Sequence, residues 1–79
     1  MVDNKELGKI CQKFRRRQGI SQLNVAIETG YSVENISAFE CGRNNNVLIF
    51  LWYVYHGMTA KNIFDAERFI RCGGDINDL

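Results

Sequence analysis

The chain has 79 residues and a formal net charge of +1, which allows one domain and gives no overall basic signature. Its composition, 46% hydrophobic and 24% charged, excludes a disordered or low-complexity chain. The absence of proline favours helices joined by short turns over a β-sandwich. Seven of the ten Lys and Arg residues precede residue 47, so a DNA partner would face the N-terminal two-thirds of the chain.

Cysteine usage and the N-terminal segment predict a cytoplasmic protein. Residues 1–9 are polar and charged, unlike a signal peptide. The three cysteines are odd in number and widely spaced: Cys11, Cys41 and Cys72. We therefore expect free thiols in a reducing compartment. Together with His56 the cysteines offer no close pair of ligands, so no metal and no cofactor are predicted.

The N-terminal half predicts two helices. Apolar residues recur at the i, i+3, i+4, i+7 spacing of one helical stripe: Leu7, Ile10, Cys11 and Phe14. Asp3 and Asn4 can cap this first helix, and Gly19 ends it. Ser21 has the residue type and position of an N-cap, which predicts a second helix over about residues 22–29.

Further caps and glycines predict three more helices. They cover about residues 33–41, 47–56 and 60–72, after Ser32, Asn46 and Thr59. The predicted fold is therefore all-α and compact, with five helices and no strand. Residues 1–72 are expected to form one domain, and residues 73–79 a flexible C-terminal tail after the Gly-Gly pair.

The second and third helices have the layout of a helix-turn-helix. The turn between residues 22–29 and 33–41 is three or four residues long and contains Gly30. Glycine suits this turn because the backbone there needs a positive φ. The small side chain of Ala26 lets the two helices cross closely, and Ile36 is expected to pack beneath the crossing.

These residues together resemble the Cro/lambda-repressor-like (Xre) family. Residues 19–32 read GISQLNVAIETGYS, Ile36 follows, and residues 39–43 read FECGR. The resemblance covers about residues 7–64. It implies a five-helix lambda-repressor-like domain that binds operator DNA as a small transcriptional regulator, a repressor, with the helix at 33–41 in the major groove.

The resemblance also implies roles for individual residues. Gln22 corresponds to a phosphate-contacting glutamine at a helix N-terminus, where free amides attract anions. Arg43 and Asn44 correspond to a second clamp on the DNA backbone. Arg16 is expected to be either an outer phosphate contact or a solvated side chain, and not a base reader. The residues expected to read bases are Ser32, Val33, Glu34, Ser37 and Ala38.

Two assignments have alternatives. Val33 can touch a thymine methyl group, and Glu34 can accept a hydrogen bond from cytosine N4. Glu34 also repels phosphate, and it can simply favour the positive end of its helix. The resemblance implies an ion pair between Arg15 and Glu40; the alternative is that both are solvated, with Arg15 on a phosphate.

Two apolar surfaces are not explained by the resemblance. Leu23 and Ile27 share the outer side of their helix, where the family usually carries charges. Residues 47–55 are apolar without a break, and family alignment turns one side inward: Ile49, Trp52, Tyr53 and His56. A second face remains, formed by Phe50, Leu51, Val54 and Tyr55. Either the helix at 60–72, through Phe64, Phe69 and Ile70, or a second copy of the chain must cover that face, and we predict a homodimer.

The competing function is a protein-interaction module on the same fold, such as an antirepressor or inhibitor that binds a protein instead of DNA. The near-neutral charge, Glu34 and the extra apolar faces favour it. An enzyme is not expected, because the single histidine, His56, has no acidic residue three or four positions away. No small-molecule substrate is expected. Neither is a membrane partner, since the longest apolar run is far shorter than the about 20 residues of a span.

Overall fold

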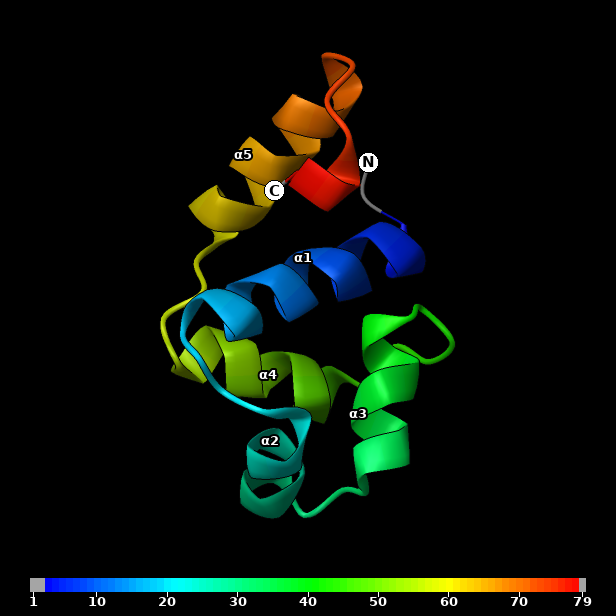
Figure 1. The fold of residues 1–79 in the computed structure, drawn as a ribbon, viewed down its shortest axis with the longest axis vertical. Coiled ribbons are helices and arrows are strands. Elements are labelled where there is room, and N and C mark those ends of the chain that lie inside the picture. The colour runs from blue at the N-terminus through cyan, green and yellow to red at the C-terminus, as the bar shows by residue number, and fades with distance from the viewer. Residues whose placement is uncertain (1–2, 79) are drawn as a thin grey trace.

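The computed structural model describes residues 3–78, and the described chain is all-α (Figure 1). Its elements are α1 (Asn4–Arg17), α2 (Gln22–Thr29), α3 (Val33–Glu40), α4 (Val47–Tyr55), α5 (Ala60–Arg71) and a 3-10 turn, η1 (Ile76–Asp78). The five predicted helices are confirmed, and no strand occurs between residues 3 and 78. The last three helices each end one residue earlier than predicted, because Cys41, His56 and Cys72 are cap residues.

Side-chain caps begin the helices at the predicted places. The hydroxyl oxygens of Ser21 and Ser32 accept hydrogen bonds from the backbone N–H groups of Asn24 and Asn35, at 3.1 and 3.2 Å. Thr59 caps α5 in the same way. First-turn amides have no partner within their own helix, so each cap contributes about 1 kcal/mol.

None of the helices in the described part of the chain combines the length and apolar character that a membrane span requires.

Helices α2 and α3 form a helix–turn–helix unit. Gly30, at the C-terminus of α2, has a φ of 79°, a conformation that side chains bearing a Cβ rarely adopt. The two helices pack directly against each other. Ala26 and Ile36 are buried at 6% and 0% exposure, as the predicted close crossing requires.

Helix α1 is the centre of the molecule. It contacts α3, α4 and α5, and it lies between α5 and α4 in Figure 1. The buried core comes mainly from α1 to α4: Ile10, Cys11, Val25, Ala26, Ile36, Phe39, Ile49, Trp52, Tyr53, Met58 and Ala66. Helix α5 contributes only Ala66 to this core. The fold is therefore a four-helix core with α5 placed outside α1.

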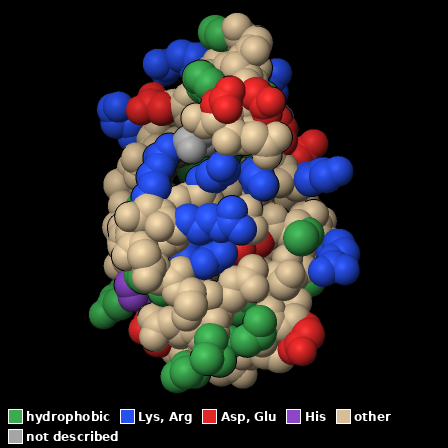
Figure 2. Space-filling model, in the orientation of Figure 1, with side chains coloured by type: hydrophobic (Ala, Val, Ile, Leu, Met, Phe, Trp, Pro, Cys, Tyr) green, Lys and Arg blue, Asp and Glu red, His purple; other side chains and the backbone are tan. Residues whose placement is uncertain are grey.

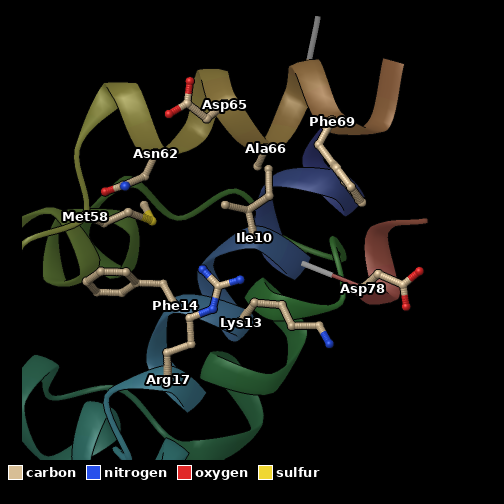
Figure 3. A pocket seen from close by; sticks show the side chains of 10 residues that line it. All are labelled: Ile10, Lys13, Phe14, Arg17, Met58, Asn62, Asp65, Ala66, Phe69 and Asp78. Atoms are coloured by element: carbon tan, nitrogen blue, oxygen red, sulfur yellow. The ribbon is translucent and has the colours of Figure 1, made fainter. Parts of the chain in front are cut away.

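Helix α5 covers α1 incompletely. An open hollow of about 340 Å³ lies between α1, α5 and the C-terminal segment, and Phe14, Phe69 and Met58 are among its lining residues (Figure 3). The segment predicted to be a flexible tail contains the η1 turn, and the Lys13 ammonium donates to the carbonyl oxygen of Asn77 at 2.9 Å. Residues 1–2 of the predicted domain and residue 79 of the predicted tail lie outside the described residues.

Candidate nucleic-acid interface

The outward side of α3 borders an open groove on the surface. The other side of this helix is buried in the core, through Ile36, Phe39 and Glu40. The groove is lined by Gln22, Val33, Glu34, Ser37, Ala38 and Arg43. Each of these six residues was predicted to contact a base or a phosphate. The fold therefore brings together residues from α2, from α3 and from the loop that follows α3.

The groove combines several kinds of contact. Gln22 contributes an amide, Ser37 a hydroxyl and Arg43 a guanidinium, while Glu34 contributes an acceptor. Val33 and Ala38 are apolar and half-buried. Arg43 is held beside α3 because its backbone N–H donates to the Ala38 carbonyl at 2.8 Å. Such a surface can approach both base edges and phosphates, because small side chains on α3 leave room for a ligand.

Three predicted contact residues lie outside the groove. Ser32 uses its hydroxyl oxygen to cap α3, as described above. The Asn44 amide donates to the Asn35 carbonyl at 3.4 Å, and its oxygen accepts from the backbone N–H of Asn46 at 3.3 Å. Arg16 is exposed on α1. Ser32 thus stabilises the N-terminus of α3, Asn44 ties the loop after α3 back to that helix, and Arg16 lies on a separate surface.

The predicted partners Arg15 and Glu40 are joined beneath the groove. The Arg15 Nε and Nη2 atoms donate to the two carboxylate oxygens of Glu40 at 2.7 and 3.0 Å. Tyr53 donates to the same carboxylate at 2.6 Å, and the Gln22 amide donates to it at 3.0 Å. Arg15 also donates to the Ile20 carbonyl at 2.7 Å. One carboxylate therefore connects α1, α2, α3 and α4.

The charge of Glu40 is stabilised by these donors. Burial raises the pKa of its carboxyl, but hydrogen bonds from Arg15, Tyr53 and Gln22 outweigh burial and leave the pKa below its ordinary value. Burial, followed by the hydrogen bond to Glu40 and then by the charge of that carboxylate, raises the pKa of Tyr53. Gln22 gives one amide hydrogen to Glu40 and keeps the second available. The network thereby fixes the position of Gln22 at the edge of the groove.

Positive charge without an ion-pair partner lies on α1 and directly after α3. Within residues 3–78, no salt bridge involves Lys5, Lys9, Lys13, Arg16, Arg17 or Arg43. Lys and Arg side chains gather over α1 across the middle of the face shown in Figure 2. The cations of α5 differ, because they pair along their own helix: Lys61 and Arg68 with Asp65, and Arg71 with Glu67. The free positive charge is therefore concentrated on α1 and after α3.

The outer side of α4 is open to solvent. Leu51, Val54 and Tyr55 are 49%, 42% and 86% exposed, so helix α5, one of the two candidates for covering them, does not cover them. The reason is the position of α5 on the far side of α1, where Phe64 and Phe69 are themselves exposed.

The placement of one residue of this face was also wrong. Phe50 is half-buried and packs against the core, because it precedes the buried Tyr53 by three positions and shares its flank of α4. The outer face instead includes two residues at the start of the helix, Val47 and Leu48, which are 61% and 57% exposed.

The sequence interpretation missed a polar contact between α2 and α4. The Trp52 indole N–H donates to Glu28 Oε1 at 2.9 Å, and His56 Nε2 lies 3.2 Å from the same oxygen. The Asn24 amide donates to the other Glu28 oxygen at 3.1 Å. The His56 ring stacks on Trp52, with centroids 3.9 Å apart. His56 is thus a residue of the core edge, as predicted, but it has a carboxylate partner that lies 28 positions away in the sequence.

Comparison of the chain with protein-family models, with curated proteins and with solved structures finds no match. The resemblance to the Cro/lambda-repressor-like family therefore remains a prediction, based on the residues named above.

Proposed function

We propose that this protein binds duplex DNA in a sequence-specific manner and regulates transcription, with α3 in the major groove. The observation that carries the proposal is the groove along α3, which six residues with donor, acceptor and apolar character line together. A helix presenting small and polar side chains fits the width of the major groove and can read base edges there. The three free cysteine thiols accord with action in a reducing cytoplasm.

Phosphate contacts are assigned to residues at the edges of the groove. We assign to Arg43 and to the second amide hydrogen of Gln22 the donation of hydrogen bonds to the DNA backbone, since both residues line the groove. Arg16 and the other free cations of α1 add positive charge that attracts the same backbone. These contacts fix the position of the protein on DNA without selecting a sequence.

Base contacts are assigned to the exposed side of α3. Ser37 can donate to or accept from a base edge, and Val33 and Ala38 can contact a thymine methyl group. Glu34 is exposed at the first turn of α3, where it can accept from cytosine N4. A carboxylate at this position also disfavours DNA sequences whose major groove presents only acceptors there. Glu34 therefore contributes to selectivity by electrostatic repulsion.

Selection from a random-sequence duplex library tests the proposal. The purified protein should enrich one sequence motif. Gln22→Ala and Arg43→Ala should weaken retention of all duplexes together, whereas Val33→Ala and Ser37→Ala should change the enriched motif. Lys61→Ala is the matched control, because Lys61 pairs with Asp65 on α5, away from the groove. Failure to retain any duplex at low salt would contradict the proposal.

A protein partner is the second candidate, favoured by a specific observation on α2. Leu23 and Ile27 are 59% and 71% exposed, next to the helix that lines the groove. An aliphatic pair beside a recognition surface suits a protein partner better than a phosphate backbone. Under this function, Leu23→Lys would abolish partner binding, whereas under the DNA function it would preserve or strengthen duplex retention by adding a cation.

A further inference from the structure

The hollow between α1 and α5 has an apolar floor. Its volume is about 340 Å³, and Ile10, Met58 and Ala66 form the buried part of its lining (Figure 3). Phe14 is half-buried and Phe69 is 41% exposed, so both aromatic rings leave apolar surface in contact with water. Small-molecule sites in proteins have volumes of about 300–1,000 Å³ and are lined mainly by such side chains. The hollow therefore has the size and the lining of a site for one small apolar group.

An arginine without a partner lines the same hollow. Arg17 belongs to the last turn of α1, and its guanidinium points from that helix toward the hollow in Figure 3. Among residues 3–78 this side chain has neither an ion-pair nor a hydrogen-bond partner. A guanidinium presents parallel N–H donors that match the two oxygens of a carboxylate. Arg17 therefore favours a ligand that carries a carboxylate.

The amide of Asn62 supplies a second donor. Its oxygen accepts hydrogen bonds from the backbone N–H and the hydroxyl of Thr59, at 2.8 and 3.0 Å. These contacts fix which end of the amide is the oxygen, because a backbone N–H can only donate. The NH₂ group of Asn62 has no partner in the described part of the chain. Two unused donors, one from α1 and one from α5, thus accompany the apolar floor.

The two acidic residues of the lining are balanced by other cations. Asp65 accepts from Lys61 at 2.7 Å and lies 3.7 Å from Arg68, so two cations of its own helix offset its charge. Asp78 shares the hollow with Lys13, whose ammonium donates to the carbonyl of the residue before Asp78 at 2.9 Å. The positive charge of Arg17 is therefore left over, and an anion complements it.

We infer that this hollow binds a small carboxylic acid with an apolar body, the carboxylate on Arg17 and Asn62 and the apolar body on the floor. The volume suits one small molecule and is too small for an extended peptide. The hollow shares no lining residue with the candidate DNA-binding groove. The inference is therefore independent of the proposed function, and it is tested without DNA.

A titration of the purified full chain with octanoate, followed by nuclear magnetic resonance of the backbone amides, tests the inference. Amides of α1 and α5 around the hollow should shift and saturate with a dissociation constant below about 1 mM. Acetate lacks the apolar body and 1-octanol lacks the charge, so each should bind at least about 10-fold more weakly. Octanoate at about ten times its dissociation constant should also raise the thermal unfolding midpoint by at least about 4 °C.

Two pairs of variants separate the charge from the apolar floor. Arg17→Gln should weaken octanoate about 10-fold and leave 1-octanol unchanged, because it removes only the charge. Arg16→Gln is the matched control, since Arg16 is also exposed on α1 but does not line the hollow. Phe69→Ser should weaken both ligands, whereas Phe64→Ser, at an exposed position of α5 outside the lining, should weaken neither.

The exposed positions of Arg17 and Phe69 make folded variants expected, and circular dichroism checks this. The absence of any saturable shift with octanoate would overturn the inference. Shifts confined to amides of α2, α3 and α4 would overturn it as well, and so would an octanoate affinity that Arg17→Gln leaves unchanged. Octanoate binding by a protein that retains no duplex would contradict the proposed function while supporting this inference.

Discussion

The Arg15 guanidinium and the Glu40 carboxylate form a two-bond ion pair between α1 and α3, and their side chains are only 7% and 1% exposed. Tyr53 and Gln22 complete the hydrogen bonding of the carboxylate. A buried charge costs several kcal/mol unless it is both paired and hydrogen-bonded, and this one is both. The pair therefore holds four helices together and positions the edge of the candidate DNA-binding groove.

Removal of Glu40 should destabilise the protein strongly. Glu40→Ala leaves the buried Arg15 charge without its counter-charge and the Tyr53 hydroxyl without an acceptor, and the expected loss is about 3–5 kcal/mol. Glu34→Ala, on the exposed side of the same helix, is the control and should change stability by less than about 1 kcal/mol. Urea unfolding measures both variants. Equal urea midpoints for Glu40→Ala and Glu34→Ala would show that the ion pair between Arg15 and Glu40 contributes nothing to stability.

Acid should remove the contribution of Glu40. Since its folded-state pKa is below its ordinary value, the carboxylate stabilises the fold fully above about pH 4.5 and loses this effect as the pH falls through the folded-state pKa. Glu40→Gln cannot carry the charge at any pH. The difference in unfolding free energy between wild type and Glu40→Gln should therefore shrink from about pH 6 to about pH 3. A constant difference across that range would contradict this assignment.

The sequence predicted the helices well because their signals are local. Ser21, Ser32 and Thr59 act on amides three positions away, and Gly30 determines its own backbone conformation. These effects do not depend on the rest of the fold. The placement of α5 was different, since its apolar residues could equally face α1 or α4, and only packing of the whole chain decides between them.

The sequence predicted the residues that line the groove, but not the hydrogen bonds that hold the surrounding helices together. Six of the predicted contact residues line the groove, because the helix-turn-helix spacing fixes their positions on α2, on α3 and directly after α3. The contacts of Tyr53 and Gln22 with Glu40, and of Trp52 with Glu28, join residues 13 to 24 positions apart. No local pattern signals such pairs, since each depends on how two helices pack.

The close packing of α1 against α3 also could not be predicted from the sequence. This packing gives a prediction for Gly8. A Cβ atom at this position would lie 2.4 Å from the Phe39 carbonyl oxygen and 2.7 Å from that of Glu40. Gly8→Ala should therefore cost about 1–3 kcal/mol, although the same change at an open helix position stabilises a protein. Thermal unfolding of Gly8→Ala beside Lys9→Ala measures this. A Gly8→Ala protein more stable than wild type would mean that the two helices lie further apart.

The three thiols should differ in reactivity. Cys11 is fully buried, and burial, with a smaller effect of the Glu40 charge, raises the pKa of its thiol to about 12. Cys41 and Cys72 are exposed. A chromogenic disulfide reagent should therefore modify two thiols rapidly in native buffer, and Cys11 only after unfolding. Cys11→Ala should leave the rapid phase unchanged. Rapid reaction of all three thiols in the native protein would contradict this packing.

The salt dependence of duplex binding tests the central claim most directly. Fluorescence anisotropy should show affinity falling steeply between about 50 and about 200 mM salt, because each phosphate contact releases counterions. Arg43→Ala should lower the slope of log K against log salt by about 1, while Lys61→Ala, whose cation pairs with Asp65, should leave it unchanged. An absence of duplex binding at about 50 mM salt, or equal slopes for wild type and Arg43→Ala, would contradict the account.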